Sequence, residues 1–579
     1  KPFFQERFWR GLGQSPMVLG VSMKRGAEKV LVSGALTLAL STAVCKLVGF
    51  AYKIPMLSYL GAEGMGYFHS AYEIYALFCV ISTAGLPVAL SVLISAAVSR
   101  GDTEEAERIY RTAFGVFLGI GVLGSGVMAA LAPMFCRLIR SENAYGCILA
   151  ISPTVFLICL SSAVRGYFQG YQRMSQTAIS QLIEAVGKLA FGLVLADIAA
   201  DRGWGVPAIA AMAGVGLTLG TLLSTLYLIA EKARFRPAPR RFPHSAGGRK
   251  ILARLTKLAL PMTLGASAVS LTKLIDMTMI LRRLQSVGYS EIAANAAYGS
   301  YTTLALSVYA LIPTLLSSVA LPLVPLLSAA IAAGDRERQA ALIRTSYRLT
   351  AVIAIPASVG IALFARPILS LLFGREPDAV AQAAPLLSLL GASVFLSCMI
   401  GATNSVLHAY RAVTKPILSL LAGAAVKVLA AYILIGSPAV GLFGAPVSTF
   451  LCNAVIVGMN LYFAGRLCPA ERMGGVFAGP LLASALSVGL CGVLYRLLVR
   501  SVGERAPLTL GMLGACVVLY AVFGCITGGI CRADLEMLPG GEAVCRVLTA
   551  CRLLPREEGK EKTNDGGSKK AVGEKPTGF

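Results

Sequence analysis

Apolar runs long enough to cross a membrane follow one another along almost the whole of this chain. Each run holds about 18 to 30 residues, and about 20 residues of helix span the roughly 30 Å hydrocarbon core of a bilayer. The composition agrees, because 56% of the 579 residues are hydrophobic and only 14% are charged. The period-two alternation of a membrane β-barrel is absent. The pattern predicts an all-α integral membrane protein with about fourteen transmembrane helices.

Polar segments divide these predicted helices into groups. Residues 1–22 differ in character from the rest of the chain, and Met23 would be an ordinary start before a first span. Two other polar segments are a basic linker and a tail rich in Lys, Glu and Gly. We expect, in chain order, a cytoplasmic arm (1–28), an N-lobe of six helices (29–231), the basic linker (232–251), a C-lobe of six helices (252–467), helices thirteen and fourteen (468–531) and a polar cytoplasmic tail (532–579).

The two predicted lobes have similar sequences. The stretch 93–102 matches the stretch 326–335, and the apolar run that holds Lys188 matches the run that holds Lys427. Each half contains six predicted spans, an even number, so both halves enter the membrane in the same orientation. The sequence therefore predicts two parallel six-helix repeats, related by an axis along the membrane normal, with two extra helices appended.

Positive charge is concentrated on one side of the predicted membrane. Most of the 52 Lys and Arg residues lie in the N-terminal arm, in alternate loops and in the C-terminal tail. The positive-inside rule places such segments in the cytoplasm. We therefore expect a multi-pass protein of the cytoplasmic membrane with both termini inside. The basic linker is expected to anchor on anionic lipid and not to bind nucleic acid.

Motifs for catalysis and for metal binding are absent from the sequence. No P-loop occurs, and no loop is long enough for the catalytic domain of a membrane glycosyltransferase or protease. The 14 cysteines are scattered, mostly within apolar runs, without metal-ligand spacing, as expected of small apolar residues. We expect a protein that is not an enzyme and that has no metal site and no cofactor.

Charged residues within the predicted spans each need a reason, because an ionised side chain at mid-bilayer costs about 2.5–3.5 kcal/mol on insertion scales. Glu184 lies four residues before Lys188, and Asp276 lies three residues after Lys273. Both spacings allow an ion pair within one helix. These two pairs are therefore either structural or part of a binding site.

Other membrane charges have no such local partner. Lys46 and Lys427 have no acid three or four positions away, so a cation that faces a cavity and attracts an anionic ligand is favoured over pairing across helices. Lys53 and Arg165 lie near helix ends, where snorkelling to the interface is the alternative. His69 and Glu73 are one turn apart, and a role linked to protons or cations is an option for them.

A cavity that contained these residues would carry a net positive charge. Such a cavity suits phosphate or diphosphate groups, which lysine binds as a point charge. An anionic lipid-linked substrate fits this charge, whereas a cationic drug does not. The candidates for substrate binding are Lys46, Lys53, Arg165, Lys188, Lys273 and Lys427, and the candidates for ion coupling or charge balance are Glu73, Glu184 and Asp276.

Two segments resemble a known family. Lys46-Leu-Val-Gly-Phe50-Ala-Tyr-Lys53-Ile-Pro55 and Arg165-Gly-Tyr-Phe-Gln169-Gly-Tyr171-Gln-Arg173-Met-Ser175 are similar to the polysaccharide-transporter and MurJ-like branch of the multidrug/oligosaccharidyl-lipid/polysaccharide exporter superfamily. Within that branch the chain most resembles the stage V sporulation protein B group. The resemblance covers about residues 24–530. It implies a MATE/MurJ-like fold that flips undecaprenyl-pyrophosphate-linked peptidoglycan or polysaccharide precursors by alternating access, for cell-wall or spore-cortex synthesis.

The same resemblance implies where the substrate would bind and what would drive transport. Basic residues of the first helix face the central cavity in MurJ-like relatives, and Lys46 and Lys53 occupy the matching positions here. Lysine stands where Gram-negative relatives usually have arginine, which weakens the case for a bidentate grip on the diphosphate. The two extra helices would offer a groove for the polyprenyl tail. Sodium, protons or the membrane potential would supply the energy.

Expected partners are the lipid-linked anionic glycan and membrane lipids, with wall-synthesis proteins as further candidates and the chain itself as a monomer. Two other functions stay open at this point. A cation-coupled multidrug antiporter of the same superfamily would have a cavity dominated by acids. A membrane partner of wall synthases that transports nothing would leave the lysines in the membrane unexplained.

Overall fold

Long helices make up almost all of the described chain. The computed structural model describes residues 25–235, 237, 247–320, 323–468 and 474–529, and within these ranges it contains helices and no strands. Twelve helices in this part of the chain are long and apolar enough to cross a membrane. The predicted all-α membrane fold is therefore confirmed. The count of about fourteen transmembrane helices stays a prediction.

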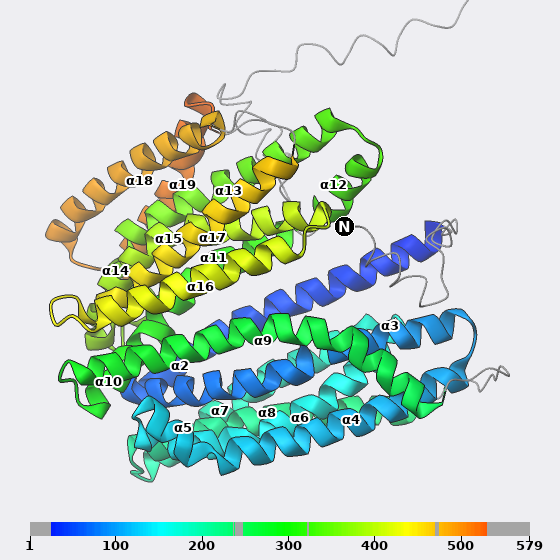
Figure 1. Ribbon diagram of the computed structural model, residues 1–579. Helices are drawn as coiled ribbons and strands as arrows, with labels where there is room; N and C mark the ends of the chain where they lie inside the picture. The colour runs from blue at the N-terminus through cyan, green and yellow to red at the C-terminus, as the bar shows by residue number, and fades with distance from the viewer. Residues whose placement is uncertain (1–24, 236, 238–246, 321–322, 469–473, 530–579) are drawn as a thin grey trace, which may run out of the picture.

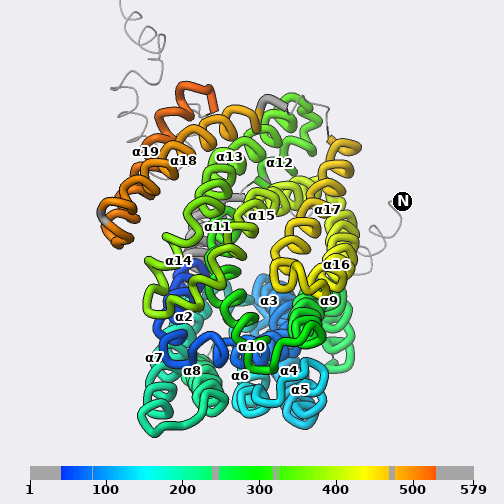
Figure 2. Tube along the Cα trace, turned by 90° about the vertical axis from the view of Figure 1, so that its left-hand side faces the viewer, coloured from blue at the N-terminus to red at the C-terminus, as the bar shows by residue number. Residues whose placement is uncertain are grey.

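The helices form two bundles, one above the other in Figures 1 and 2. The first bundle, here the N-lobe, consists of α2 (Arg25–Thr83), α3 (Leu86–Ser99), α4 (Thr103–Ala130), α5 (Ala132–Ile139), α6 (Tyr145–Gly170), α7 (Met174–Asp201) and α8 (Val206–Arg234). The second bundle, here the C-lobe, consists of α9 (Gly248–Ser286), α10 (Glu291–Ser300), a π-helix (Tyr301–Ala305), α11 (Leu306–Ala320), α12 (Leu323–Ala332), α13 (Arg336–Leu363), α14 (Ala365–Phe373), α15 (Pro377–Ala409), α16 (Thr414–Ile435) and α17 (Gly444–Leu467).

Two further helices, α18 (Gly474–Val502) and α19 (Ala506–Ile526), lie on the side of the C-lobe away from the N-lobe. The ring of Tyr495 on α18 meets Phe364 at the start of α14, with 5.6 Å between ring centroids. The predicted domain boundaries are consistent with this order but stay predictions. Most of the arm 1–28 and all of the tail 532–579 fall outside the described residues, together with part of the basic linker.

Matching turns in the two lobes reflect the internal repeat. Asp102 and Asp335 each cap a helix N-terminus, accepting the backbone N–H of the residue three positions further on at 2.8 and 2.9 Å, as Asp commonly does. A glycine with positive φ precedes each aspartate. The tight turns before α7 and α16 also correspond, since Gln172 and Arg411 both have φ of 57°. The repeat inferred from sequence is therefore present in the local backbone.

One end of the molecule, where α9 turns into α10, holds the two lobes together. Helix α2 bends there at Gly61, whose φ of 62° and ψ of −179° suit only glycine well. The second arm of α2 then packs closely on α10, because a Cβ at Gly66 would lie 2.2 Å from the Asn295 carbonyl oxygen and one at Gly299 would lie 1.9 Å from that of Ala62. Small residues let helices approach closely in membranes.

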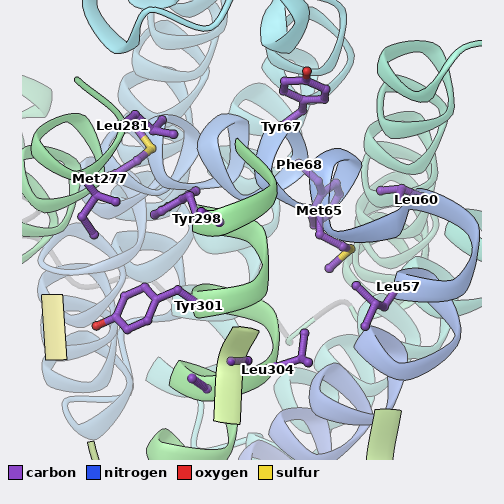
Figure 3. Close-up of a cluster of buried hydrophobic side chains, with 14 of the residues drawn as sticks. Leu57, Leu60, Met65, Tyr67, Phe68, Met277, Leu281, Tyr298, Tyr301 and Leu304 are labelled. Atoms are coloured by element: carbon purple, nitrogen blue, oxygen red, sulfur yellow. The ribbon is translucent and has the colours of Figure 1, made fainter. Parts of the chain in front are cut away.

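A hydrophobic core crosses from one lobe to the other at this end, as Figure 3 shows. Met65 and Phe68 of α2 and Met277 and Tyr298 of the C-lobe are all at most 5% exposed and belong to one buried cluster. Polar contacts surround this core, and in one of them the Asn295 amide donates to Ser141 Oγ at 3.1 Å. The lobes are thus closed against each other at the α9–α10 end.

Candidate functional site

A cavity of about 490 Å³ lies within the N-lobe and contains four of the six predicted cations. Helices α2, α6, α7 and α8 supply its walls. We call this space the N-cavity. Its lining residues are Thr42, Cys45, Lys46, Gly49, Tyr52, Lys53, Phe68, His69, Tyr72, Arg165, Gln181, Glu184, Ala185, Lys188 and Leu217.

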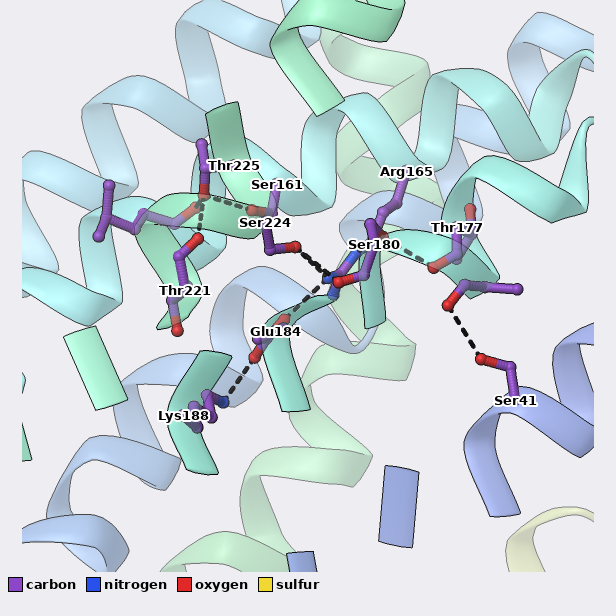
Figure 4. A network of polar contacts seen from close by, with 12 residues as sticks. Ser41, Ser161, Arg165, Thr177, Ser180, Glu184, Lys188, Thr221, Ser224 and Thr225 are labelled. Atoms are coloured by element: carbon purple, nitrogen blue, oxygen red, sulfur yellow. Dashed lines mark hydrogen bonds and ion pairs between the residues drawn. The ribbon is translucent and has the colours of Figure 1, made fainter. Parts of the chain in front are cut away.

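Arg165, Glu184 and Lys188 form one charged network at the wall of the N-cavity (Figure 4). Glu184 Oε1 accepts from Lys188 Nζ at 2.6 Å, and Glu184 Oε2 accepts from Arg165 Nη2 at 2.8 Å. The predicted pair of Glu184 with Lys188 is therefore confirmed. The snorkelling alternative is wrong for Arg165, because its side chain is only 12% exposed and ends on the carboxylate.

Two serines hold the guanidinium of this network in place. Arg165 Nε donates to Ser180 Oγ at 2.9 Å, and Arg165 Nη2 also donates to Ser224 Oγ at 3.2 Å. Ser180 and Ser224 are fully buried, on α7 and α8 respectively. Helices α7 and α8 can approach this closely because Gly187 packs directly against Gly220. Two cations share one carboxylate, so the network keeps a net positive charge.

Lys46 and Lys53 line the same cavity from α2. Lys46 is exposed and pairs with no acidic residue in the described part of the chain. Lys53 is half-buried, and its ammonium donates to Ser307 Oγ at 2.7 Å at the start of α11. Snorkelling is therefore wrong for Lys53 as well. This lysine connects the wall of the N-cavity to the C-lobe.

The lysines of the C-lobe are arranged differently from the sequence-based expectation. Lys427 Nζ donates to Asp276 Oδ2 at 2.8 Å, across the contact between α16 and α9, and both side chains are less than 20% exposed. The prediction that Lys427 is an unpaired cation is wrong, as is the pairing of Asp276 with Lys273. Spacing along one helix cannot show a partner on another helix. Lys273 is exposed and does not line the N-cavity.

Glu73 lies between the two sets of charges. It is half-buried on the second arm of α2 and interacts electrostatically with Lys53 of the N-lobe and with Lys273, Asp276 and Lys427 of the C-lobe. Glu73 thus interacts with lysines of both lobes at once. A change in the separation of the lobes would therefore change the electrostatic environment of Glu73.

Several uncharged residues of the N-cavity were missed by the sequence analysis. Tyr52, Phe68 and Tyr72 form an aromatic wall, with 6.4 Å between the Phe68 and Tyr72 centroids. His69 Nε2 and Gln181 Oε1 are buried without a hydrogen-bond partner among the described residues. Both residues line the N-cavity, so a polar ligand bound there could contact these atoms. Only His69 had attracted notice in the sequence.

Comparisons with known proteins identify relatives of the chain. The model of a family described as "Lipid II flippase MurJ" matches residues 56–501. Stage V sporulation protein B of Bacillus subtilis is 25% identical over 364 residues, which cover 61% of this chain and 69% of that protein.

Two solved structures share the fold. A structure described as lipid II flippase MurJ in an inward closed conformation aligns with a TM-score of 0.63 at 16% identity and covers 85% of this chain and 98% of its own. An inward-facing multidrug resistance MATE transporter of the MOP superfamily aligns with a TM-score of 0.60 at 17% identity, covering 74% of this chain and 97% of its own. The expected MATE/MurJ-like fold is confirmed.

Proposed function

The chain belongs to the MurJ family of lipid II flippases, and from this membership we propose that it carries a diphosphate-bearing, lipid-linked precursor of peptidoglycan or of another polysaccharide across the cytoplasmic membrane. The protein is a multi-pass membrane transporter and not an enzyme. The observation that supports the proposed cargo is the charge of the N-cavity. Four cations and one carboxylate line it.

The chemistry of the N-cavity suits a diphosphate. Lys46 has no acidic partner in the described ranges, and Lys188 and Arg165 share the single carboxylate of Glu184. Such cations bind phosphate oxygens through short charge-assisted hydrogen bonds. The volume of about 490 Å³ falls in the usual range of small-molecule sites. We therefore assign Lys46, Lys188, Arg165 and Lys53 to the diphosphate and its neighbouring sugar.

The charged residues of the C-lobe would act on the bound diphosphate from a greater distance than the cations of the N-cavity. Asp276 neutralises Lys427, so Lys427 contributes less to anion binding than its sequence position suggests. Lys273, exposed near Glu73, adds to the positive field between the lobes. Glu73 is the proposed coupling residue, because it interacts with lysines on both lobes. Sodium, protons and the membrane potential are the candidate energy sources.

Alternating access fits the two-lobe architecture. The lobes close at the α9–α10 end through small-residue packing, and Lys53 joins them through Ser307. With both termini in the cytoplasm, as the charge bias favours, this closed end is the outer one. Rocking of parallel repeats would then open it. Helices α18 and α19 are proposed to hold the polyprenyl tail.

Cell-wall and spore-cortex precursors are both proposed cargoes, since the related Bacillus protein is named for sporulation and the family for lipid II. We propose that the chain acts as a monomer beside wall-synthesis proteins. The multidrug-antiporter alternative has less support, because cations outnumber acids in the N-cavity. A partner that transports nothing would have no use for cations in the membrane.

A binding measurement with purified protein tests the proposed cargo. Undecaprenyl diphosphate should bind more tightly than undecaprenol, which lacks the phosphates. Lys46→Ala should weaken diphosphate binding by roughly tenfold, as expected for one charge-assisted hydrogen bond. Lys415→Ala, an exposed lysine at the start of α16 and outside the N-cavity, is the matched control and should change nothing. Equal binding of the two lipids would refute the diphosphate assignment.

A further inference from the structure

A second cavity, of about 540 Å³, lies at the junction of the two lobes at the α9–α10 end. Helices α5 of the N-lobe and α9 and α16 of the C-lobe line it. Leu271, Ile275 and Met279 of α9 make one apolar wall, and the first two are 47% and 37% exposed. These residues belong to a membrane-spanning helix. We call this cavity the junction groove, and it is separate from the N-cavity.

Three arginines stand at the polar end of the junction groove. Arg140 ends α5, and Arg282 and Arg283 lie in the last turns of α9. Among the described residues no acid lines the groove, and none of the three arginines is ion-paired there. The groove therefore joins an apolar wall to an uncompensated positive rim.

Arg283 is held firmly in position. Its Nε donates to the Tyr432 carbonyl oxygen at 3.1 Å, and its guanidinium lies 4.2 Å from the centroid of the Tyr432 ring. Gly436 makes room for it, since a Cβ there would collide with the guanidinium. A guanidinium that is already ordered loses little conformational freedom when it binds a phosphate.

The groove is built by both lobes. Arg140 and Leu138 come from the N-lobe, while the other lining residues come from the C-lobe. The Gln285 amide donates to the Arg140 carbonyl oxygen at 2.7 Å and fixes this junction. A ligand that touched both sides would bind the closed arrangement better than an open one, and by linkage it would favour closure.

We propose that the junction groove binds an anionic phospholipid that clamps the two lobes together at the α9–α10 end. The phosphate contacts Arg140, Arg282 and Arg283, and an acyl chain lies along Leu271 and Ile275. Charge complementarity selects an anionic head group, and the exposed apolar wall within a membrane-spanning helix selects a lipid over a soluble anion. This proposal does not depend on the identity of the transported cargo.

Native mass spectrometry of the purified full chain tests lipid binding. Phosphatidylglycerol should be retained, whereas phosphatidylcholine with the same acyl chains should not. The double variant Arg140→Gln with Arg282→Gln should lose affinity for phosphatidylglycerol about thirtyfold, because each arginine near an anionic lipid contributes roughly a fivefold factor. Arg202→Gln with Arg375→Gln removes two exposed arginines that lie outside the groove and should change retention little.

Hydrogen exchange separates a clamp from a passive lipid contact. Addition of phosphatidylglycerol should slow exchange in peptides covering 136–144 and 284–295, and the double variant should lose this protection while keeping wild-type exchange in α6 and α15. Equal retention of both lipids, or unchanged retention by the groove variant, would overturn the site. Protection by inorganic phosphate alone would overturn the role of the acyl chain. Retention without any change in exchange would overturn the clamp.

Discussion

Replacement of Gly299 by alanine should open the closed end of the molecule. The added Cβ would lie 1.9 Å from the Ala62 carbonyl oxygen and 2.7 Å from the Gly66 backbone nitrogen. Both are backbone atoms, so no side chain can move away to relieve the clash. An ordinary contact at 3.4 Å requires α2 and α10 to separate by about 1.5 Å. Overpacking of this kind costs roughly 1–3 kcal/mol.

That cost falls only on the closed arrangement, so the ratio of closed to open molecules should fall by about 5- to 150-fold. Hydrogen exchange of the protein in nanodiscs reports the ratio of closed to open molecules. Peptides covering 62–72 and 291–300 should both exchange faster in the variant than in the wild type. Gly119→Ala on α4 is the control, because a Cβ at Gly119 meets nothing within 4 Å. Folded Gly299→Ala protein with wild-type exchange in both peptides would show that the packing of α2 on α10 does not hold this end closed.

Three other predictions concern the charges. Lys427→Met should lower the stability of the protein by about 3 kcal/mol because it leaves Asp276 buried without its partner. Thermal unfolding should show that the added substitution Asp276→Asn restores most of this loss. If the two losses of stability simply added, Lys427 and Asp276 would not form a pair. Lys53→Met and Ser307→Ala should each speed hydrogen exchange at the closed end. The double variant should exchange little faster than either single variant, because both substitutions remove the same hydrogen bond. Binding of the diphosphate lipid should weaken several-fold between about 0.05 and 0.5 M salt. Added salt shortens the Debye length and so screens the attraction between the cations and the diphosphate. Binding that did not depend on salt would count against an electrostatic site.

Features that depend on neighbouring residues in the chain could be predicted from the sequence. The apolar runs indicated the membrane helices, and the repeated Gly-Asp turn at Asp102 and Asp335 indicated two related halves. The pair of Glu184 and Lys188 could be predicted because a four-residue spacing places both side chains on one face of a helix. Local geometry determines each of these features.

Features that depend on packing between helices could not be predicted. Lys427 and Asp276 are far apart in sequence and meet only because α16 lies beside α9. Lys53 reaches Ser307 for the same reason. The packing of α2, α6, α7 and α8 likewise determines two further features. It confines the described N-cavity to one lobe, and it forms the aromatic wall of that cavity. A single sequence holds no direct record of such contacts.

The cations of the N-cavity are proposed to bind a diphosphate-bearing lipid during its passage across the membrane. The most direct measurement reconstitutes the protein in liposomes with a fluorescent undecaprenyl-diphosphate-linked sugar and follows its sidedness with a membrane-impermeant quencher. Wild-type protein should expose inner-leaflet lipid to the quencher, and the double variant Lys46→Ala with Lys188→Ala should reduce the rate to that of empty liposomes. A double variant that folds and transports at the wild-type rate would show that these cations do not bind the transported lipid.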